Sequence, residues 1–328
     1  MDRYIIITSI FSPSEAIRHF AGTNLPVVVV GDKKAPEGWS FGDVKYLSID
    51  TQKGMGFRLT ELLPYHHYGR KMLGYLYAIE NGANEIYDTD DDNFPNREWG
   101  FPSFAGDFSM IPPDKGFINV FQFFTGSRIW PRGFPLNHIL DSKMPETDLL
   151  IKKVKVGVWQ GLIDEDTDVD SIYRLTSNET ITFIERPPVV LGKKSICPFN
   201  SQNTLFRKEL FPLLYLPSEV TFRFTDILRG LVAQPIMWLY DYYLGFTGPS
   251  VIQKRNPHDL MKDFKSEIQM FLYAESVPEI VSSVITSSRA IGDNLFDAYA
   301  ALQRRDIVTS NELKILEAWL YDIQRLSM

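Results

Sequence analysis

The sequence predicts an α/β protein with a doubly wound, mostly parallel sheet and a helical C-terminal region. Residues 4–11 and 26–31 are continuous apolar runs rich in Ile and Val, which is typical of strands covered on both faces. Residues 12–24 between them start with Ser-Pro and stop with Gly-Thr-Asn, as a helix does. Strands that alternate with helices form parallel sheets, and such sheets bind ligands beyond the carboxyl ends of their strands.

The alternation of strands and helices continues toward residue 90. A short strand is expected at 44–48, and a longer helix at about 65–81 is closed by Asn81-Gly82. The next predicted strand, residues 84–89, reads NEIYDT and leads into a cluster of acids.

The texture of the chain changes after residue 95. From about 95 to 220, Pro and Gly are frequent and the apolar pieces are short, such as FINVFQFF (117–124) and TITFIE (180–185), which indicates the second half of the sheet together with loops. Residues 225–245 are expected to be helical, beginning at Thr225-Asp226, and the chain from 259 onward is expected to be helical to its end.

Composition excludes several classes of protein. A chain of 328 residues that is 44% hydrophobic can bury a full core, and its net charge of -7 argues against a nucleic-acid partner. The single cysteine, Cys197, excludes an intramolecular disulfide and is expected to be a core residue. No apolar run approaches the ~20 residues that span a bilayer, so we expect no transmembrane segment and a soluble protein.

Four acids lie within five positions where the strand at 84–89 ends: Asp88, Asp90, Asp91 and Asp92. Carboxylates held this close repel one another unless a cation is supplied. Magnesium and manganese prefer such oxygen ligands and commonly join one or two carboxylates to a substrate diphosphate. A solvated acidic turn is the alternative interpretation, because Asp and Asn are favoured in turns.

Other motifs that bind ions or phosphate are missing. The acidic run LIDEDTDVD does not form an EF-hand, because Val169 and Leu175 stand where that loop needs Gly and Glu. The chain has no Gly-rich phosphate loop after its first strand and no Gly-X-Ser-X-Gly. Phosphate would then be held by metal and by cationic side chains, for which Arg70, Lys71 and Arg255 are candidates.

Five segments resemble successive blocks of the STELLO family of glycosyltransferases. They are LPYHHYGRKMLGYLYAIENGANEIYDTDDDN (63–93), GLIDEDTDVDSIYRLT (161–176), CPFNSQNTLF (197–206), FRFTDILRGLVAQ (222–234) and QKRNPHDLMKDFKSEI (253–268). The blocks are in the family's order, and the resemblance spans residues from about 5 to 275.

The resemblance implies a GT-A glycosyltransferase fold, in which a Rossmann-like, doubly wound mixed sheet binds a metal and a nucleotide-sugar diphosphate. Residues 1–258 would form the nucleotide-sugar-binding and catalytic domain. Residues 259–328 would form a helical C-terminal extension packed on the core. The plant members of the family are larger, membrane-anchored Golgi proteins. This chain shows no anchor, which favours a cytoplasmic enzyme, either free or peripheral to a membrane.

The resemblance also assigns roles to the acids. Asp90 and Asp92 correspond to the family's Asp-X-Asp motif, with Asp92 expected on the metal and Asp90 on the metal or the donor ribose. Asp91 would orient this pair or touch the donor sugar. GT-A enzymes often take a further metal ligand from a late histidine, for which His258 is the candidate; a helix-capping role is the alternative.

Transfer with inversion needs a base to deprotonate the acceptor hydroxyl. Asp226 resembles the base of inverting GT-A enzymes, although helix capping explains its position equally well. Asp164 or Glu165 is the reserve. Thr8, Ser9 and Asp32 lie at strand ends where GT-A proteins hold the nucleotide, and Asp32 could accept a hydrogen bond from a uracil N–H.

We therefore expect a hexosyl- or pentosyltransferase that depends on Mn²⁺ or Mg²⁺. Its donor would be a nucleotide-diphosphate sugar, with a UDP-sugar as first choice, and its acceptor a glycan or a lipid-linked molecule. A nucleotidyltransferase and a non-catalytic GT-A-like scaffold are the alternatives. The apolar stripe Leu313, Leu316, Leu320 and Ile323 is expected to pack on the core. A homodimer or a membrane-surface contact through the C-terminal helices is the other interpretation.

Overall fold

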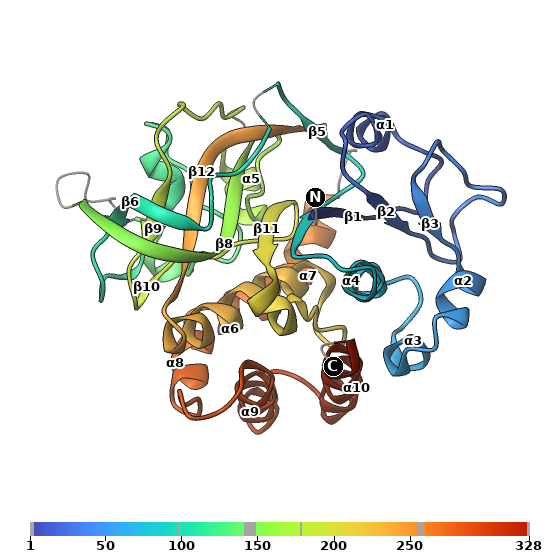
Figure 1. The fold of residues 1–328 in the computed structure, drawn as a ribbon. Helices are drawn as coiled ribbons and strands as arrows, with labels where there is room; N and C mark the ends of the chain where they lie inside the picture. The colour runs from blue at the N-terminus through green and yellow to red at the C-terminus, as the bar shows by residue number, and fades with distance from the viewer. Residues whose placement is uncertain (1–2, 98, 141–148, 178, 255–258, 327–328) are drawn as a thin grey trace.

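Parallel strands form the N-terminal half of the sheet in the computed structural model, which describes residues 3–97, 99–140, 149–177, 179–254 and 259–326 (Figure 1). They are β1 (Arg3–Thr8), β2 (Val27–Val30), β3 (Lys45–Leu47) and β4 (Glu85–Thr89). Strand β1 pairs in parallel with β2 and β4, and β2 with β3. The four strands predicted from the sequence in this region are therefore confirmed.

Helices cover both faces of these strands. Helix α1 (Glu15–Ala21) begins after Ser14, whose hydroxyl accepts a hydrogen bond from the Ile17 amide and so caps the helix. It packs on Ile5 and Ile7 of β1, whereas α4 (Lys71–Glu80) packs with Ile6 on the opposite face. Because successive strand residues point to opposite faces, the continuous apolar runs are explained by this double covering.

Short helices lead into α4. They are α2 (Ile49–Gly54), α3 (Arg58–Leu62) and the 3₁₀-helix η1 (Tyr68–Arg70). Gly74 lets α4 approach the sheet closely, since a Cβ there would lie 2.7 Å from side-chain carbons of both Ile6 and Val30. The chain then turns back into β4, which directly precedes the acids Asp90–Asp92. The close packing of α4 on the sheet therefore helps to position these acids.

The second half of the sheet combines short strands with two long ones, β8 of 16 residues and β12 of 12 residues, which the sequence did not suggest. Its strands are β5 (Asn93–Pro95), β6 (Ala105–Ile111), β8 (Leu150–Glu165), β9 (Val189–Leu191), β11 (Asn203–Arg207) and β12 (Tyr242–Gln253), and β7 (Gly116–Phe117) pairs with β10 (Ser195–Ile196) in a small separate sheet. The ten strands of the main sheet among the described residues follow the order β3-β2-β1-β4-β11-β8-β6-β9-β12-β5, and β8 also pairs with β12. Strand β11 is antiparallel to β4, so the sheet is mixed.

Three predictions in this region differ from the structure. The apolar piece around Phe121 forms a 3₁₀-helix, η2 (Val120–Phe123), and not a strand. The piece TITFIE contributes only an isolated bridge from Ile181 to Glu165. The helix expected at 225–245 is shorter: α6 (Thr225–Leu239) ends before Asp241, which has a φ of 56°, and the aromatic residues that follow pair with β8.

Short helical turns connect these strands. They are η3 (Leu136–His138), α5 (Ser171–Thr176), η5 (Lys208–Leu214) and η6 (Phe222–Phe224).

The chain ends in helices, as predicted: α7 (Leu260–Tyr273), α8 (Val277–Ser282), α9 (Ile291–Gln303) and α10 (Ser310–Leu326). Helices α8, α9 and α10 lie together with α6 below the sheet in Figure 1. The stripe on α10 packs on the core, with Leu316 and Ile323 buried and Leu313 and Leu320 partly buried. The extension thus shares its hydrophobic core with the rest of the fold.

Two buried carboxylates of α10 reach across to earlier segments. Asp322 accepts hydrogen bonds from the amides of Arg58 (3.1 Å) and Leu59 (2.9 Å), which are otherwise unpaired at the start of α3. Glu312 accepts from the Tyr215 hydroxyl and from the amides of Ser218 (3.0 Å) and Glu219 (2.7 Å). Within the part of the chain that is described, no helix combines the length and the apolar character required to cross a membrane.

Candidate active site

Two adjoining cavities open at the carboxyl ends of the N-terminal strands. The first, of about 250 Å³, is called the acidic cavity and is lined by Asp90, Asp91, Asp92, Asp168, Asp226, Arg132 and Arg223 among others. The second, of about 220 Å³, is called the Asp32 cavity and is lined by Ile10, Phe11, Val30, Gly31, Asp32 and His67 among others. Thr8, Tyr68, Asp91 and Phe222 belong to both walls, so the cavities are neighbours.

The acidic cavity has an excess of negative charge. Among its described lining residues, five Asp side chains face two Arg side chains. Both arginines are already bound by carboxylates, Arg132 by Asp168 and Asp226 and Arg223 by Glu267. A multiply charged anion alone would be repelled here, and a cation would be attracted.

Neighbouring strands fix the loop Asp90–Asp92 between β4 and β5. The Ser9 hydroxyl donates to the Asp91 carboxylate, and the Ser14 hydroxyl donates to the Asp91 carbonyl at 2.6 Å. On the other side, the Gln253 amide group donates to Asp92 Oδ2 at 3.1 Å. The end of β1 and the end of β12 therefore hold the loop from both sides.

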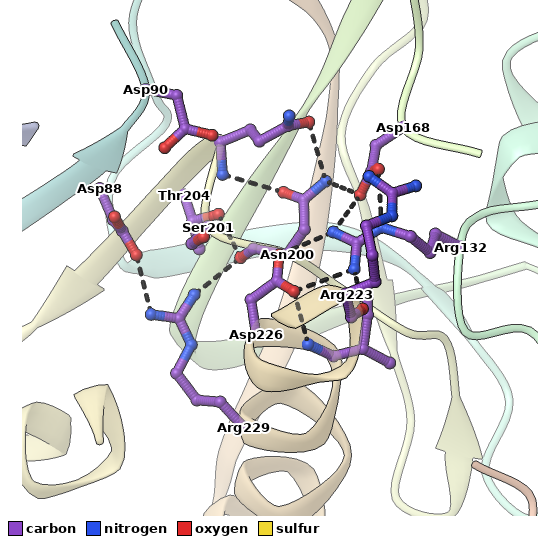
Figure 2. Close-up of polar contacts among 12 residues, drawn as sticks. Asp88, Asp90, Arg132, Asp168, Asn200, Ser201, Thr204, Arg223, Asp226 and Arg229 are labelled. Atoms are coloured by element: carbon purple, nitrogen blue, oxygen red, sulfur yellow. Dashed lines mark hydrogen bonds and ion pairs between the residues drawn. The ribbon is translucent and has the colours of Figure 1, made fainter. Parts of the chain in front are cut away.

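Asp88 is a buried structural residue beneath this loop, as Figure 2 shows. Lys71 Nζ lies 2.6 Å from Asp88 Oδ1 and 3.0 Å from Asp90 Oδ1, and Arg229 Nη1 lies 2.8 Å from Asp88 Oδ2. Lys71, which the sequence suggested for phosphate binding, thus forms ion pairs with Asp88 and Asp90 inside the protein. Burial would lower the pKa of Lys71, but Asp88 and Asp90 outweigh burial and raise it.

The donor set of the loop fits a hard divalent cation. Burial raises the pKa of Asp90 to about 6, Lys71 opposes this rise and the nearby Asp92 adds to it. A cation between the carboxylates would relieve this cost. The described residues contain no group of three His, Cys, Asp or Glu side chains that could hold a metal. A metal on Asp90 and Asp92 would therefore need water and substrate oxygens as further ligands, as Mg²⁺ commonly has.

On the opposite wall, Arg132 joins two carboxylates (Figure 2). Its Nη1 and Nη2 donate to the two oxygens of Asp226 at 3.0 and 2.8 Å, and its Nε and Nη2 donate to Asp168 at 2.8 and 2.9 Å. Burial alone would raise the pKa of Asp168, but the Arg132 guanidinium holds it well below its usual range. Asp226 stands in the first turn of α6, whose N-terminus favours a negative charge.

The Asp32 cavity contains the candidates for nucleotide binding. Thr8 and Ser9 line it at the end of β1, and Asp32 lines it after β2. The Asp32 carboxylate accepts from the amides of Lys33 and His66, both at 2.6 Å. Because a carboxylate has about four acceptor positions, Asp32 can accept further hydrogen bonds.

Arg70 also lines the Asp32 cavity, but its guanidinium is buried and donates to Gln52 and to the Leu63 carbonyl. Arg70 therefore contributes to the site by holding the wall of the Asp32 cavity in place.

The chain is similar to STELLO proteins. A family model described as STELLO glycosyltransferases matches residues 223–328. "Probable glycosyltransferase STELLO1" and "Probable glycosyltransferase STELLO2" of Arabidopsis thaliana are 26% identical over 342 residues and 25% identical over 344 residues, and each alignment covers 98% of this chain. The resemblance to the STELLO family is confirmed. The chain spans 44% of the length of each of these relatives.

The STELLO similarity reaches further than the sequence blocks suggested. We expected it to stop near residue 275, yet the family model continues to residue 328 and so includes α8, α9 and α10. The sequence of α8, α9 and α10 has no distinctive motif of charged or polar residues by which the family resemblance could be recognised. The mixed sheet and the helices around it agree with the GT-A-like fold of such transferases.

The structure brings most of the residues suggested by the STELLO resemblance together, but not all of them. Asp90, Asp91, Asp92 and Asp226 line the acidic cavity. Asp164, the reserve base, is not among the residues lining either cavity, and its carboxylate accepts from the Phe183 amide at 2.9 Å. Burial raises the pKa of Asp164. Glu165 ends β8 with a φ of 67°.

Two further candidates, Arg255 and His258, lie outside the described residues.

Sequence reasoning missed the residues that hold Asp226. Arg132 precedes Gly133, whose φ is 85° and where a Cβ would lie 2.3 Å from Ile227, so the loop rests against the start of α6. Asp168 was noted in the acidic run LIDEDTDVD and in the STELLO-like block 161–176, but not as a partner of Arg132. Asn200, which donates to Asp168 at 2.8 Å, lies in the block CPFNSQNTLF. The resemblance of these two blocks to the STELLO family was the one sequence feature that could have pointed to Asp168 and Asn200.

Proposed function

We propose that this protein is a glycosyltransferase that moves a sugar from a nucleoside-diphosphate sugar to a hydroxyl group of an acceptor. The observation that supports this best is the position of the Asp90–Asp92 loop between two cavities. The Asp32 cavity has apolar walls and a carboxylate acceptor, which suits a nucleoside. The acidic cavity contains Asp226, which suits a hydroxyl that must lose a proton.

Asp90 and Asp92 would hold Mg²⁺ or Mn²⁺ together with the donor diphosphate. Such a metal, when bound, neutralises the charge of the diphosphate and makes it a better leaving group. The chain's own residues supply the remaining functions. Ser9 and Ser14 keep the loop in position, and Asp32 accepts a hydrogen bond from a base that offers a ring N–H, as uracil does.

The acceptor would react from the Asp226 side of the acidic cavity. Its oxygen forms a bond to the anomeric carbon while the bond from that carbon to the diphosphate oxygen breaks. The electron pair of the broken bond leaves with the nucleoside diphosphate, and the acceptor proton passes to Asp226 Oδ2. Attack from the face opposite the leaving group inverts the anomeric centre, so we propose an inverting enzyme.

Calorimetric titration with a panel of UDP-, GDP-, CDP- and ADP-sugars, with and without Mn²⁺, tests the donor. We expect a UDP-sugar to bind, and to bind more tightly with Mn²⁺. Turnover is then measured as release of the nucleoside diphosphate, with water as the acceptor in the absence of a glycan. Binding of a nucleoside triphosphate with release of pyrophosphate would favour a nucleotidyltransferase, and binding of no nucleotide at all would leave the scaffold interpretation.

The Asp226→Asn variant tests the base. We expect it to bind the donor as the wild type does and to lose turnover by at least about 10²-fold, because general-base catalysis contributes about 10²–10⁴-fold. Full turnover in this variant would eliminate Asp226.

A further inference from the structure

Arg132 is fully occupied by the groups around the candidate base. A guanidinium has five N–H donors, and each of those of Arg132 has an acceptor: two on Asp168, two on Asp226 and the carbonyl oxygen of Arg223. The Arg132 backbone amide also donates to the Asp168 carbonyl at 3.1 Å. The side chain is 5% exposed, so water contributes little to this arrangement.

These contacts restrict the Asp226 carboxylate to one orientation. Oδ1 accepts from Arg132 at 3.0 Å and from the Ile227 amide at 3.0 Å, which fills its acceptor positions. Oδ2 accepts from Arg132 at 2.8 Å, and the hydrogen bonds of the described residues leave it one further position. Asp226 is part of the wall of the acidic cavity, where that remaining position can receive an acceptor proton.

We propose that Arg132, anchored by Asp168 and Asn200, is the positioning residue that aims Asp226 Oδ2 at the acceptor hydroxyl. This inference rests on the proposed function, and it gives Arg132, Asp168 and Asn200 a role that neither the sequence motif nor the family resemblance assigns to them. Asp168 Oδ2 accepts hydrogen bonds from both Arg132 and the Asn200 amide group (2.8 Å), so the chain just before β11 holds Asp168 in place.

A lysine cannot replace this arginine, although it keeps the charge. The ammonium group has three donors on one atom and cannot bind four carboxylate oxygens in a plane. In Arg132→Lys the charge of the network is unchanged, but the orientation of Asp226 is no longer fixed. A displacement of about 1 Å at a reacting group can cost about 10²-fold in rate.

The test measures nucleoside-diphosphate release from the bound UDP-sugar, with water as acceptor, in Arg132→Lys and in Asp168→Asn. We expect kcat to fall about 10²-fold in the first and about tenfold in the second, with the donor KM within about twofold of the wild type. Arg207→Lys is the matched control. Arg207 makes a forked pair with Glu209 at 2.7 and 3.0 Å outside both cavities, so its kcat should not change.

A double-mutant cycle separates positioning from a general structural effect. If Arg132 acts through Asp226, Arg132→Lys will cause no further loss in the Asp226→Asn background. An equal loss in both backgrounds, a changed donor KM with kcat intact, or an unchanged kcat in Arg132→Lys would overturn the proposal.

If Arg132→Lys fails to fold, the Asp168→Asn variant, which keeps the volume of the side chain, replaces it in the test. The cycle is then run with Asp168→Asn and Asp226→Asn. Absence of any donor turnover in the wild type would instead reject the proposed function, and the role of Arg132 with it, so the two failures are distinguishable.

Discussion

Asp92 carries the metal prediction at the scale of single residues. It lines the acidic cavity and is held by Gln253, so Asn in its place should keep the loop in position and remove one negative ligand. We expect Asp92→Asn to lose the Mn²⁺-dependent part of UDP-sugar binding, by about tenfold or more in Kd, because losing even an outer-shell partner of a metal ligand costs about 10–100-fold in metal affinity. Calorimetry with Mn²⁺ and with EDTA measures this loss.

The control for Asp92→Asn is Asp241→Asn. Asp241 is exposed, pairs with Lys193 and has a left-handed φ of 56° that Asn tolerates. If Asp92→Asn retains the wild-type response to Mn²⁺, Asp92 is not a ligand.

Glu312 predicts a pH dependence of stability. Burial raises its pKa from 4.5 to about 7, although hydrogen bonds from the Tyr215 hydroxyl and from the amides of Glu219 and Ser218 oppose the rise; the Glu219 carboxylate adds to it. The folded protein binds this proton more tightly than the unfolded chain, so the associated stability is fully present below pH 4.5 and is lost as the pH rises through about 7. At 1.36 kcal/mol per unit of pKa, the loss is on the order of 3 kcal/mol.

Glu312→Gln should remove this dependence. Its amide oxygen can accept from Ser218 and Glu219 while its amide nitrogen donates to the Tyr215 hydroxyl. We expect the variant to be more stable than the wild type at pH 8 and similar to it at pH 5, as measured by thermal denaturation. Glu317→Gln on the exposed side of the same helix is the control, and an equal pH response in Glu312→Gln and the wild type would refute the role of Glu312.

The sequence pointed to individual candidate residues more readily than to the partners that hold them. The acids after β4 were recognisable because they follow a strand directly, and Asp226 because it begins a helix. Arg132 lies 94 positions before Asp226 and 36 before Asp168, and nothing local marks it as their shared partner. The sequence suggested Lys71 for phosphate binding. Its burial between Asp88 and Asp90 depends on tertiary packing, which the sequence does not display.

At the scale of elements, the contact between α4 and the sheet gives a packing prediction. A methyl group at position 74 would lie 2.7 Å from Ile6 and Val30, so Gly74→Ala should force α4 outward. Overpacking costs about 1–3 kcal/mol, which exceeds the gain of about 1 kcal/mol from replacing a helical Gly. We expect a net loss of stability in urea denaturation.

Gly54→Ala is the matched control for this substitution. Gly54 also belongs to a helix, but an added Cβ would meet nothing within 4 Å. It should be neutral or slightly stabilising. Equal effects at both positions would mean that α4 does not press on β1 and β2 as described.

Elements with a local pattern were predictable, and those defined by remote pairing were not. β1, β2, β4 and α1 follow from runs of Ile and Val or from caps. β12 was read as part of a helix because its aromatic residues follow α6 without an obvious break, and its partners in β8 lie about ninety positions earlier in the register Tyr242↔Lys155. A strand of this kind becomes recognisable only once its neighbour is known.

For the whole molecule, the C-terminal helices are expected to be necessary for folding. Helix α10 buries Trp319, whose indole donates to the Pro212 carbonyl at 2.9 Å, and it satisfies amides of α3 and of the chain at 218–219. A chain that ends at Asp306 should therefore be insoluble or lack a cooperative thermal transition, because buried apolar surface and backbone donors would be uncovered.

Soluble expression and circular dichroism measure this outcome. A substitution confined to the exposed face of α10, such as Glu317→Gln, should leave both unchanged. Cooperative unfolding of the shortened chain would instead show that α10 is dispensable for folding.

Phe222 belongs to the walls of both cavities and stands just four positions before Asp226. Any change at this ring reshapes the proposed nucleoside side and the proposed acceptor side together. We therefore expect that, as enzymes of this architecture diverge, preference for a new acceptor and preference for a new donor evolve in linked steps. A library of Phe222 variants should accordingly contain few members in which only one of the two preferences has shifted.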